Sequence, residues 1–554
     1  MKEVIWPKHL TERFTLFKKT TPQTIIDASV RSWVSKYCVK QVSKQDYLNL
    51  AEALPSNDLD AAEFISDTLG SQITYIPTSK TGGDWYYWNG KVHQKASMGL
   101  VDDDLATALA DFLKQTLPGI HHHITEDFDE DGAKKLRAAF GPVVEYQKRI
   151  RGEASHSKLR KRVQVAFTKP EDYFDQDQRW AVMADGQVID LANLDAPFLE
   201  PDPNRAVSKK MGLSAHETSP EAFDFWQSTL DSWLPDKEDQ RYLQVAAGAA
   251  LLGRGDAKNI VTLVGISNTG KSTYIRTMAA VFGDYAGSLP VNAIVQKYGG
   301  STNFDQYKAR GKRFLYLEEP QNTRTDDSFL KNLSGGGGVI PTQEKGKNVV
   351  EWRAQCVLHI AANHVPKVDH TDNAIVERLD IIPFDHVFNI GSAERTERLE
   401  DVLFDTSGVA ILLWVLEGAA EYLKTGVIPK SDAIKARAKR NAVKSSATLK
   451  WLEDVTAGDF PQYVIAPSAN LSEMATQKDA YQLFQIWCNE AGEKVVPKRS
   501  AWLDELEKHL GAPSNFREKR PGGYARVYGL LPSSTNKSAG LHNLGSGYWK
   551  DTRG

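Results

Sequence analysis

The sequence predicts an α/β fold with a largely parallel sheet for the central part of the chain, and three observations support this prediction. From about residue 252 to residue 388, apolar runs of strand length alternate with helical patterns, which is the order of parallel strands and their connecting helices. One run, Ile260–Val264, leads through a glycine-containing turn into a helical pattern. Two later runs end in polar side chains, first two carboxylates and then an amide. Functional residues are therefore expected where these runs end.

Length and composition describe an ordinary globular protein with several domains. The chain has 554 residues, of which 41% are hydrophobic and 25% charged, and domains of about 100–200 residues would divide it into roughly two to four parts. The net charge is -3, but residues 427–554 carry 19 Lys+Arg against 13 Asp+Glu, whereas residues 101–131 are acidic. The net charge of the whole chain therefore excludes only a uniformly basic nucleic-acid binder. The basic C-terminal part, residues 427–554, indicates contacts with a polyanion.

The cysteines and the apolar runs indicate the compartment. The three cysteines have neither metal-ligand spacing nor the density of a disulfide framework. The N-terminus lacks the apolar core of a signal peptide, and no run approaches the ~18 apolar residues of a membrane span. We expect a reduced, cytoplasmic protein, in a bacterial or host cell, with no membrane partner.

Changes of pattern along the chain predict six segments. Two strand-turn-strand patterns, around residues 71–95 and residues 181–191, indicate a mixed α+β domain. Residues 100–165 look helical but interrupted by the acidic stretch. The expected segments are a helical segment 1–70, the α+β domain 71–220, the α/β domain 221–425, a basic linker 426–475, a small C-terminal domain 476–532 and a flexible tail 533–554.

The sharpest signal is a phosphate-binding loop. The residues from Gly265 to Ser272 fit G-x-x-x-x-G-K-[ST], with a strand pattern before them and a helical pattern after them. Such a loop points backbone N–H groups at phosphates, and the helix adds the positive end of its dipole. Lys271 would reach the β- and γ-phosphates of ATP, and Ser272 would ligate Mg²⁺. The residues assigned to the nucleotide are Gly265, Asn268, Thr269, Gly270, Lys271, Ser272 and Thr273.

Three further polar positions could complete an ATP site. Glu318 and Glu319 end an apolar run, so we assign Glu318 to the metal and Glu319 to the activation of the attacking water. Asn363 ends a later run and could hold that water or sense the γ-phosphate, although a simple turn-forming Asn is an alternative. Arg378 is a candidate arginine finger acting from a neighbouring subunit, with an ordinary surface Arg as the alternative.

These motifs stand in one order within about 120 residues, and here the sequence resembles the superfamily 3 helicases of the phage, plasmid and poxvirus primase-helicase branch. The resemblance is strong over residues 220–425 and weaker on both sides. It implies a P-loop NTPase core of AAA+ type, a ring-forming collar in the preceding domain and a winged-helix-like C-terminal domain. The matching motifs are GISNTGKST, RFLYLEEP, LSGGGGVIP, IAANHVP and VERLDIIPF, with weaker matches at WYYWNGKV, DGQVIDL, YQLFQIWCNEAG and RVYGLL.

The same resemblance implies a function and a DNA path. It implies an ATP-dependent DNA helicase, active in replication, that forms a ring of six subunits and moves 3′ to 5′ along single-stranded DNA. A hairpin in residues 335–347 would enter the channel and grip the strand through Lys345 and Lys347, whereas a solvated Gly/Lys loop is the alternative. The family usually has two arginines where this chain has Glu377 and Arg378, so the finger role is assigned to Arg378 alone.

Two basic segments lie nearer the C-terminus. Residues 430–450 hold seven positive residues, which are equally compatible with a solvated lever between domains and with nucleic-acid contact. A second group surrounds a Gly-Gly turn and Tyr524, in a pattern that resembles the wing of a winged helix, with structural scaffolding as the alternative. The DNA-binding residues that we expect there are Arg517, Lys519, Arg520 and Arg526.

Other functions remain open at this point. An origin-binding or loader protein could use ATP as a switch without processive unwinding. A bifunctional primase-helicase is a second alternative, because His121, His122 and His123 with Asp127 and Asp129 could imitate a two-metal site, although an acidic solvated loop is the better interpretation. A small-molecule kinase is disfavoured by the length of the chain. The expected partners are single-stranded and forked DNA, further copies of the chain, and a separate primase or polymerase.

Overall fold

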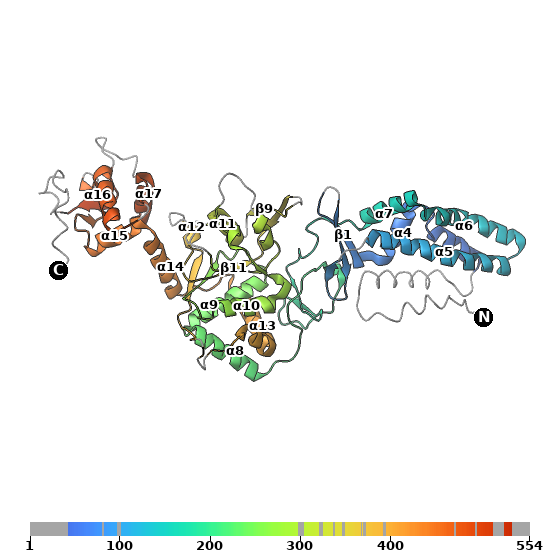
Figure 1. Ribbon diagram of the computed structural model, residues 1–554, viewed down its shortest axis with the longest axis horizontal. Helices are drawn as coiled ribbons and strands as arrows, with labels where there is room; N and C mark the ends of the chain where they lie inside the picture. The colour runs from blue at the N-terminus through green and yellow to red at the C-terminus, as the bar shows by residue number, and fades with distance from the viewer. Residues whose placement is uncertain are drawn as a thin grey trace.

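The computed structural model describes residues 43–79, 82–96, 101–296, 304–320, 325–335, 338–345, 349–366, 368, 373–389, 391, 395–469, 473–493, 496–512 and 526–533. They form three units that follow one another along the long axis (Figure 1). We call residues 43–167 the N-terminal unit, 220–425 the central unit and 447–533 the C-terminal unit, and we call residues 168–219 the connector. The expected tail 533–554 lies outside the described residues from residue 534 onward.

The N-terminal unit combines a small sheet with a bundle of helices. The sheet is antiparallel and consists of β1 (Ile73–Pro77), β2 (Gly83–Trp88) and β3 (His93–Lys95), which confirms the strand-turn-strand pattern. Asn89 closes the β2–β3 turn by accepting backbone hydrogen bonds from Lys91 and Val92. The helices are α3 (Lys44–Ala53), α4 (Asp58–Leu69), α5 (Val101–Asp127), α6 (Glu130–Ile150) and α7 (Glu153–Phe167).

The acidic stretch interrupts the helical segment at one point, as the sequence predicted, and its acids also start the helices on both sides. Helix α5 continues through the three histidines to Asp127, and the only break before α6 is Phe128 and Asp129. Asp102 lies in the first turn of α5 and Glu130 in the first turn of α6. Carboxylates at these positions favour helix formation because they face the positive end of the helix dipole. Asp129 also caps α6 by accepting a hydrogen bond from the Gly132 N–H at 2.8 Å.

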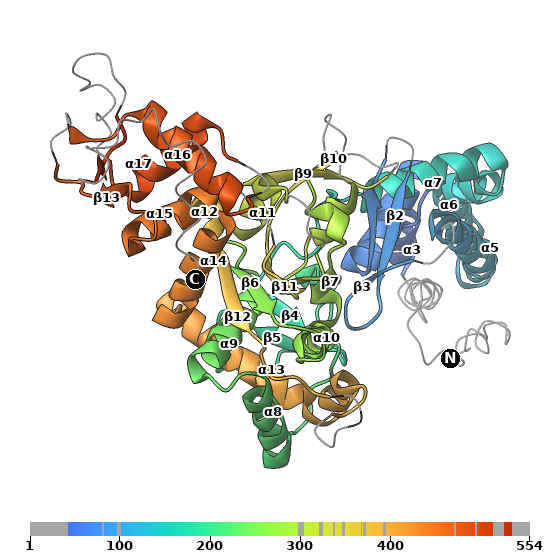
Figure 2. The ribbon, with the colours of Figure 1, turned by 60° about the vertical axis from the view of Figure 1, so that its left-hand side comes forward.

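The central unit is built on a five-stranded parallel sheet, which confirms the predicted α/β class. The strand order is β12-β6-β11-β8-β7, and every neighbouring pair is parallel. The strands are β6 (Ile260–Val264), β7 (Ala286–Ser288), β8 (Phe314–Glu318), β11 (Val357–Ala362) and β12 (Leu379–Pro383). Helices α9 (Lys237–Leu251) and α10 (Lys271–Phe282) pack against it (Figure 2), whereas α8 (Pro220–Trp233) packs against α13 (Leu399–Thr425).

A separate hairpin projects from the central unit between β8 and β11. It consists of β9 (Val339–Gln343) and β10 (Val349–Arg353), and it follows the short helix α11 (Asp327–Gly335). Alternate side chains face the core, so that Ile340 and Trp352 are buried. Lys345 lies exposed in the turn, and Lys347 lies outside the described residues.

Helix α13 (Leu399–Thr425) is the most apolar helix of the central unit. By length and composition it could cross a membrane, which differs from the expectation that no run has this character, and no other helix in the described part of the chain passes that test. It packs against α8, α9 and α10, and 56% of its most apolar window is buried inside the protein. Its composition is therefore that of a core helix.

The basic stretch after α13 is tied to the central unit by two ion pairs. Lys430 contacts the buried carboxylate of Asp380 at 2.7 Å, and Arg437 of helix α14 (Asp432–Ser445) contacts the buried Asp239. Burial raises the pKa of Asp380 despite this lysine. Two of the seven cations in this stretch therefore anchor α14 to the sheet and are not available for nucleic acid.

The C-terminal unit has a core of large aromatic side chains. It contains α15 (Ala447–Ala457), β13 (Tyr463–Ile465), α16 (Gln477–Glu490), α17 (Arg499–His509) and β14 (Leu530–Pro532), with β13 and β14 antiparallel. Trp451 of α15 packs against Phe484 of α16 and Trp502 of α17. Helix α15, in the segment expected as a linker, therefore belongs to the same core as α16 and α17.

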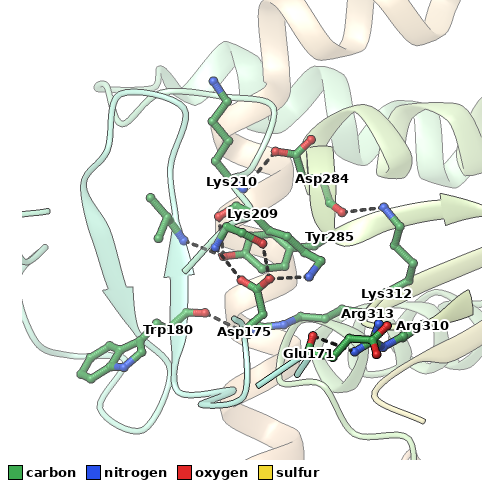
Figure 3. Close-up of polar contacts among 12 residues, drawn as sticks. Glu171, Asp175, Trp180, Lys209, Lys210, Asp284, Tyr285, Arg310, Lys312 and Arg313 are labelled. Carbon is green, nitrogen blue, oxygen red and sulfur yellow. Dashed lines mark hydrogen bonds and ion pairs between the residues drawn. The ribbon is translucent and has the colours of Figure 1, made fainter. Parts of the chain in front are cut away.

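The connector is fastened to the central sheet by the buried Arg313, which directly precedes β8. Figure 3 shows its guanidinium reaching Trp180 of strand β4 (Trp180–Val182), which pairs with β5 (Val188–Asp190) as the sequence predicted. Its nitrogens donate to the backbone carbonyls of Trp180 at 2.9 Å, Gln178 at 3.2 Å and Leu251 at 2.8 Å. It also lies over the Tyr285 ring, 4.6 Å from the centroid.

A largely buried carboxylate stabilises the connector itself. Asp175 accepts hydrogen bonds from the backbone and the hydroxyl of Ser208, and Lys209 contacts it at 2.6 Å (Figure 3). Burial acts to raise the pKa of Asp175, but Lys209 and Ser208 outweigh it and hold the pKa below its usual value. The Asp175 side chain thus links two distant parts of the connector.

We expect Arg313→Met to lower the free energy of unfolding by about 3 kcal/mol or more. One buried carbonyl, that of Leu251, and two part-buried carbonyls would lose this donor, and each unsatisfied buried group costs about 1–3 kcal/mol. Urea unfolding followed by tryptophan fluorescence measures the change. Arg310→Met is the matched control, because Arg310 is less buried and donates to one carbonyl, that of Glu171 at 3.2 Å. Equal losses in the two variants would contradict the anchoring role of Arg313.

Candidate active site

The loop after β6 has the backbone shape that its glycines require. A Cβ on Gly265 would lie 2.1 Å from the carbonyl oxygen of Phe384, and a Cβ on Gly270 would lie 2.5 Å from the indole nitrogen of Trp233. Gly270 also has a φ of 93°, and Asn268 has a φ of 64°, a region that Asn tolerates better than most residues. The loop leads directly into α10, which begins at Lys271.

The Lys271 side chain lies within the curve of this loop. It is 7% exposed, and its ammonium donates to the carbonyls of Gly265 at 2.6 Å and Ile266 at 2.7 Å and to the Thr269 hydroxyl at 3.1 Å. Burial lowers the pKa of Lys271, and the Glu319 carboxylate opposes this shift. A charged ammonium held in this way is placed to meet an anion at the start of α10.

The strand ends bring further predicted residues to the same edge of the sheet. The β6–β11 register places Ala362 beside Val264, and the β11–β8 register places Glu318 beside Ala361. Asn363 and Glu319 therefore follow their strands at the edge where the loop begins. Glu319 has a φ of 51°, which is uncommon for a residue with a side chain, and its N–H donates to the Ala361 carbonyl at 2.8 Å. This turn directs the chain away from the sheet at Glu319.

A cavity of about 660 Å³ joins these groups. Ser272, Thr273, Glu319 and Asn363 line it together with Lys271 and residues 267–270 of the loop. Volumes of this order are typical of small-molecule sites. Glu318 is not among the lining residues. Its carboxylate lies 3.5 Å from Arg276 of α10, which does line the cavity and also contacts Glu400 at 3.6 Å.

Part of the cavity wall was missed by the sequence analysis. Helix α8 contributes side chains at helical spacing, and the segment before α13 contributes Arg395 and Arg398, which together with Arg276 of α10 place three cations in the wall. In Arg395 the Nη1 atom is buried without a hydrogen-bond partner among the described residues, which suits a site that receives an anion. The missed lining residues include Phe225, Ser228, Thr229, Ser232, Trp233, Arg276, Phe388, Arg395 and Arg398.

Arg378 lies at the opposite edge of the sheet from the cavity. Its carbonyl accepts a hydrogen bond from the N–H of Ile260, the first residue of β6, at 2.6 Å. The loop starts after Val264, the last residue of β6. The length of that strand, on the order of 15 Å, therefore separates Arg378 from the loop. Its Nη1 donates to the Ala374 carbonyl, and its Nε is buried without a partner in the described part of the chain.

The comparisons with known proteins cover this part of the chain. Residues 263–378 match one family model, which is described as a family of unknown function (DUF5906). The match runs from the end of β6 to Arg378 and so includes the loop, Glu318, Glu319 and Asn363. It covers less than half of the chain.

Curated relatives carry helicase names. The chain is 23% identical over 163 residues to "Putative helicase 022R" of Frog virus 3 (isolate Goorha), covering 28% of this chain and 17% of the relative. It is 25% identical over 306 residues to "Putative helicase V13" of Sputnik virophage, covering 48% and 37%. A protein of Invertebrate iridescent virus 6, "Putative helicase 184R", is 26% identical over 185 residues, covering 31% and 19%. The matched region is helicase-like, and it spans less than two fifths of each relative.

Solved structures give a weaker likeness. The C-terminal region of NrS-1 in its apo A form covers 82% of this chain and 90% of its own length, with 12% identity and a TM-score of 0.41. A second apo structure of that region, residues 305–718, covers 86% of this chain and 100% of its own length, with 11% identity and a TM-score of 0.42. Both scores are too low to establish a common fold.

The remaining predicted residues lie elsewhere. Arg526 donates to the Met474 carbonyl at 2.7 Å, which is a structural contact, while Arg517, Lys519 and Arg520 lie outside the described residues. His122 and His123 pair with acids one turn along α5. Within the ranges that the structure describes, no three His, Cys, Asp or Glu side chains are grouped to hold a metal ion. A two-metal primase site near His121 therefore has no support there.

Proposed function

We propose that this protein is an ATP-driven DNA helicase of the superfamily 3 type that acts in the cytoplasm on a replicating phage, plasmid or other mobile element. The observation that carries the proposal is one cavity lined by Lys271, Ser272, Glu319 and Asn363, all of which the sequence assigned to ATP. The helicase names of the viral relatives support the same activity. The roles that we propose for individual residues follow from the chemistry of ATP hydrolysis.

The loop and its neighbours can perform phosphoryl transfer to water. The loop N–H groups and Lys271 would hold the phosphates, and Asn363 would orient the attacking water that Glu319 polarises. The Ser272 hydroxyl and the Glu318 carboxylate are oxygen donors, which suit Mg²⁺, an ion that takes few protein ligands and completes its shell with phosphates and waters. When bound, the ion would neutralise developing charge on the phosphates. Glu318 would have to leave Arg276 to reach it.

A neighbouring subunit would complete the site. Arg378 lies too far from its own cavity, so a finger role requires a head-to-tail contact in which it meets the next subunit's ATP. Contacts of this kind close into a ring when the rotation between subunits permits it. We therefore propose a homo-oligomeric ring, with six subunits by family resemblance, in which residues 71–220, which precede the central unit, form the collar.

The β9–β10 hairpin would couple hydrolysis to movement along one DNA strand. We expect the Lys345→Ala/Lys347→Ala variant to keep its basal rate of ATP hydrolysis. Stimulation of hydrolysis by single-stranded DNA should be lost, and the rate of unwinding should fall at least about tenfold, because the two lysines of the hairpin would bind DNA phosphates. A phosphate-release assay with and without oligo(dT) and a strand-separation assay measure both. Lys424→Ala, a change of one exposed lysine on α13, is the control. Full unwinding by the double variant would contradict this role of the hairpin.

The second candidate is an ATP-switched origin-binding or loader protein. The C-terminal unit favours it, because its order of helix, strand, two helices and strand is compatible with a winged helix that binds duplex DNA. Such a protein would hydrolyse ATP and bind DNA without separating strands. Strand separation by the unaltered protein therefore decides between the two candidates. A separate primase or polymerase would be a partner in either case.

A further inference from the structure

The most basic part of the described chain lies in the N-terminal unit, at the junction of α6 and α7, and includes none of the residues predicted to bind ATP or DNA. Between residues 148 and 162 there are seven Lys and Arg residues and one acid, Glu153. This segment belongs to the N-terminal unit, whose helix α5 begins with three aspartates. The seven cations are Lys148, Arg149, Arg151, Lys158, Arg160, Lys161 and Arg162.

Three of these cations already have acidic partners. Lys148 contacts Glu145 at 2.8 Å, and Arg151 contacts Asp111 of α5. Arg160 reaches the buried Asp102 at 3.2 Å, where Gln164 also donates to the same carboxylate at 2.9 Å. Two acids of α5 and one of α6 thus neutralise three of the seven cations.

The cations on the outer side of α7 have no such partner. Lys158, Lys161 and Arg162 are exposed, and none of them takes part in an ion pair or hydrogen bond within the described residues. Their direction is fixed by the opposite face of the helix, where Leu159 and Val163 are buried. We call Lys158, Lys161 and Arg162 the α7 face.

The spacing of the α7 face suits a chain of phosphates. Residues three and four apart are neighbours on a helix surface, and like charges at these positions destabilise the helix. Lys158 and Arg162 lie about 6 Å apart along the axis. An anion with several charges would remove this repulsion by contacting all three side chains at once. A membrane surface fits less well, because Val165, 70% exposed, is the only large apolar side chain on this face, whereas membrane-surface helices present several such residues.

We propose that the α7 face binds the phosphodiester backbone of DNA and so forms a second contact site, away from the hairpin. This rests on the proposed function in one respect, that the protein acts on DNA. Figures 1 and 2 both place α7 and the β9 strand on the same, upper side of the molecule, which allows one DNA molecule to contact both. The site recognises backbone charge and carries no sequence preference.

The test is DNA binding by Lys158→Ala/Lys161→Ala/Arg162→Ala, measured by fluorescence anisotropy with labelled dT20 and with a labelled 20-base-pair duplex at several NaCl concentrations. The control is Lys44→Ala/Lys114→Ala/Lys424→Ala, which removes the same charge from three exposed lysines on other helices. Each lost phosphate contact lowers the slope of log K against log[NaCl] by about 0.7 for a single strand and about 0.9 for a duplex. The slope is therefore expected to fall by about 2 with dT20 or by nearly 3 with the duplex, and the Kd to rise at least about tenfold.

The outcomes separate this proposal from the proposed function. A lower slope in the α7-face variant alone, with ATP hydrolysis in the absence of DNA unchanged, supports the site, and the size of the change shows which form of DNA it holds. Equal slopes and equal Kd values in the unaltered protein and the variant overturn the site but leave a DNA helicase. An unaltered protein that binds neither DNA overturns both. A variant that loses binding only to anionic phosphatidylserine vesicles overturns the assignment to DNA.

Discussion

Lys271→Ala is expected to lower the rate of ATP hydrolysis by about 100- to 1000-fold or more. Lys271 is 7% exposed and its ammonium lies within the loop, where a positive charge would meet the phosphates of ATP away from bulk water. Removing one preorganised donor from a site where charge develops costs about that factor. A methyl group cannot replace it, and Ser272 and Thr273 carry no charge. Phosphate release with saturating Mg²⁺ and ATP measures the loss.

Two controls make this result specific. Lys271 also holds the loop through its bonds to Gly265 and Ile266, so circular dichroism and the unfolding midpoint must show that the variant is folded. Lys424→Ala removes an exposed lysine of α13 and is expected to keep full activity. Normal hydrolysis by a folded Lys271→Ala protein would contradict the assignment of ATP to this cavity.

Arg378→Ala is expected to lower hydrolysis by about 10³-fold or more in the assembled protein, the range known for an arginine finger. Binding of a fluorescent ATP analogue should be much less affected, because an arginine finger acts mainly on charge that develops in the transition state, whereas the loop and Lys271 would hold the nucleotide. Glu377→Ala is the matched control, since Glu377 is the exposed neighbour of Arg378 and belongs to no predicted site. A drop of the same size in both variants would indicate a local folding defect.

Mixing two inactive variants tests whether Arg378 acts between subunits. Each variant keeps the group that the other lacks. Where an Arg378→Ala subunit supplies the loop and a Lys271→Ala subunit supplies Arg378, the interface between them has every catalytic group in place. In an equal random mixture about a quarter of the interfaces are of this kind, so hydrolysis should recover toward that fraction. Without recovery, Arg378 does not complete a neighbour's site.

The strands of the central sheet were predictable because they are buried on both faces. Ile260–Val264 and Val357–Ala362 read as uninterrupted apolar runs in the sequence, as parallel strands usually do. Their bounds in the structure agree with the predicted runs. The polar residues that end the runs therefore came to one edge, and the register confirms that Glu318 and Asn363 share it.

Residues that depend on distant parts of the chain were not predictable in the same way. Helix α8 shows an amphipathic pattern, but nothing in it tells that Phe225 and Thr229 face the loop after β6. Arg313 was expected only as the start of a strand, because its partners are carbonyls 62 and more positions away. Lys430 and Arg437 likewise find Asp380 and Asp239 through the fold.

Strand separation by the unaltered protein tests the helicase proposal most directly. The substrate is a forked duplex in which one strand carries a fluorophore and the other carries a quencher. The assay contains Mg²⁺ and ATP, and the Lys271→Ala variant serves as the inactive reference. We predict ATP-dependent release of the labelled strand, absent in Lys271→Ala, and with singly tailed duplexes we predict release only from those with a 3′ tail. A protein that binds the fork and hydrolyses ATP at full rate, yet releases no strand, would contradict the proposal.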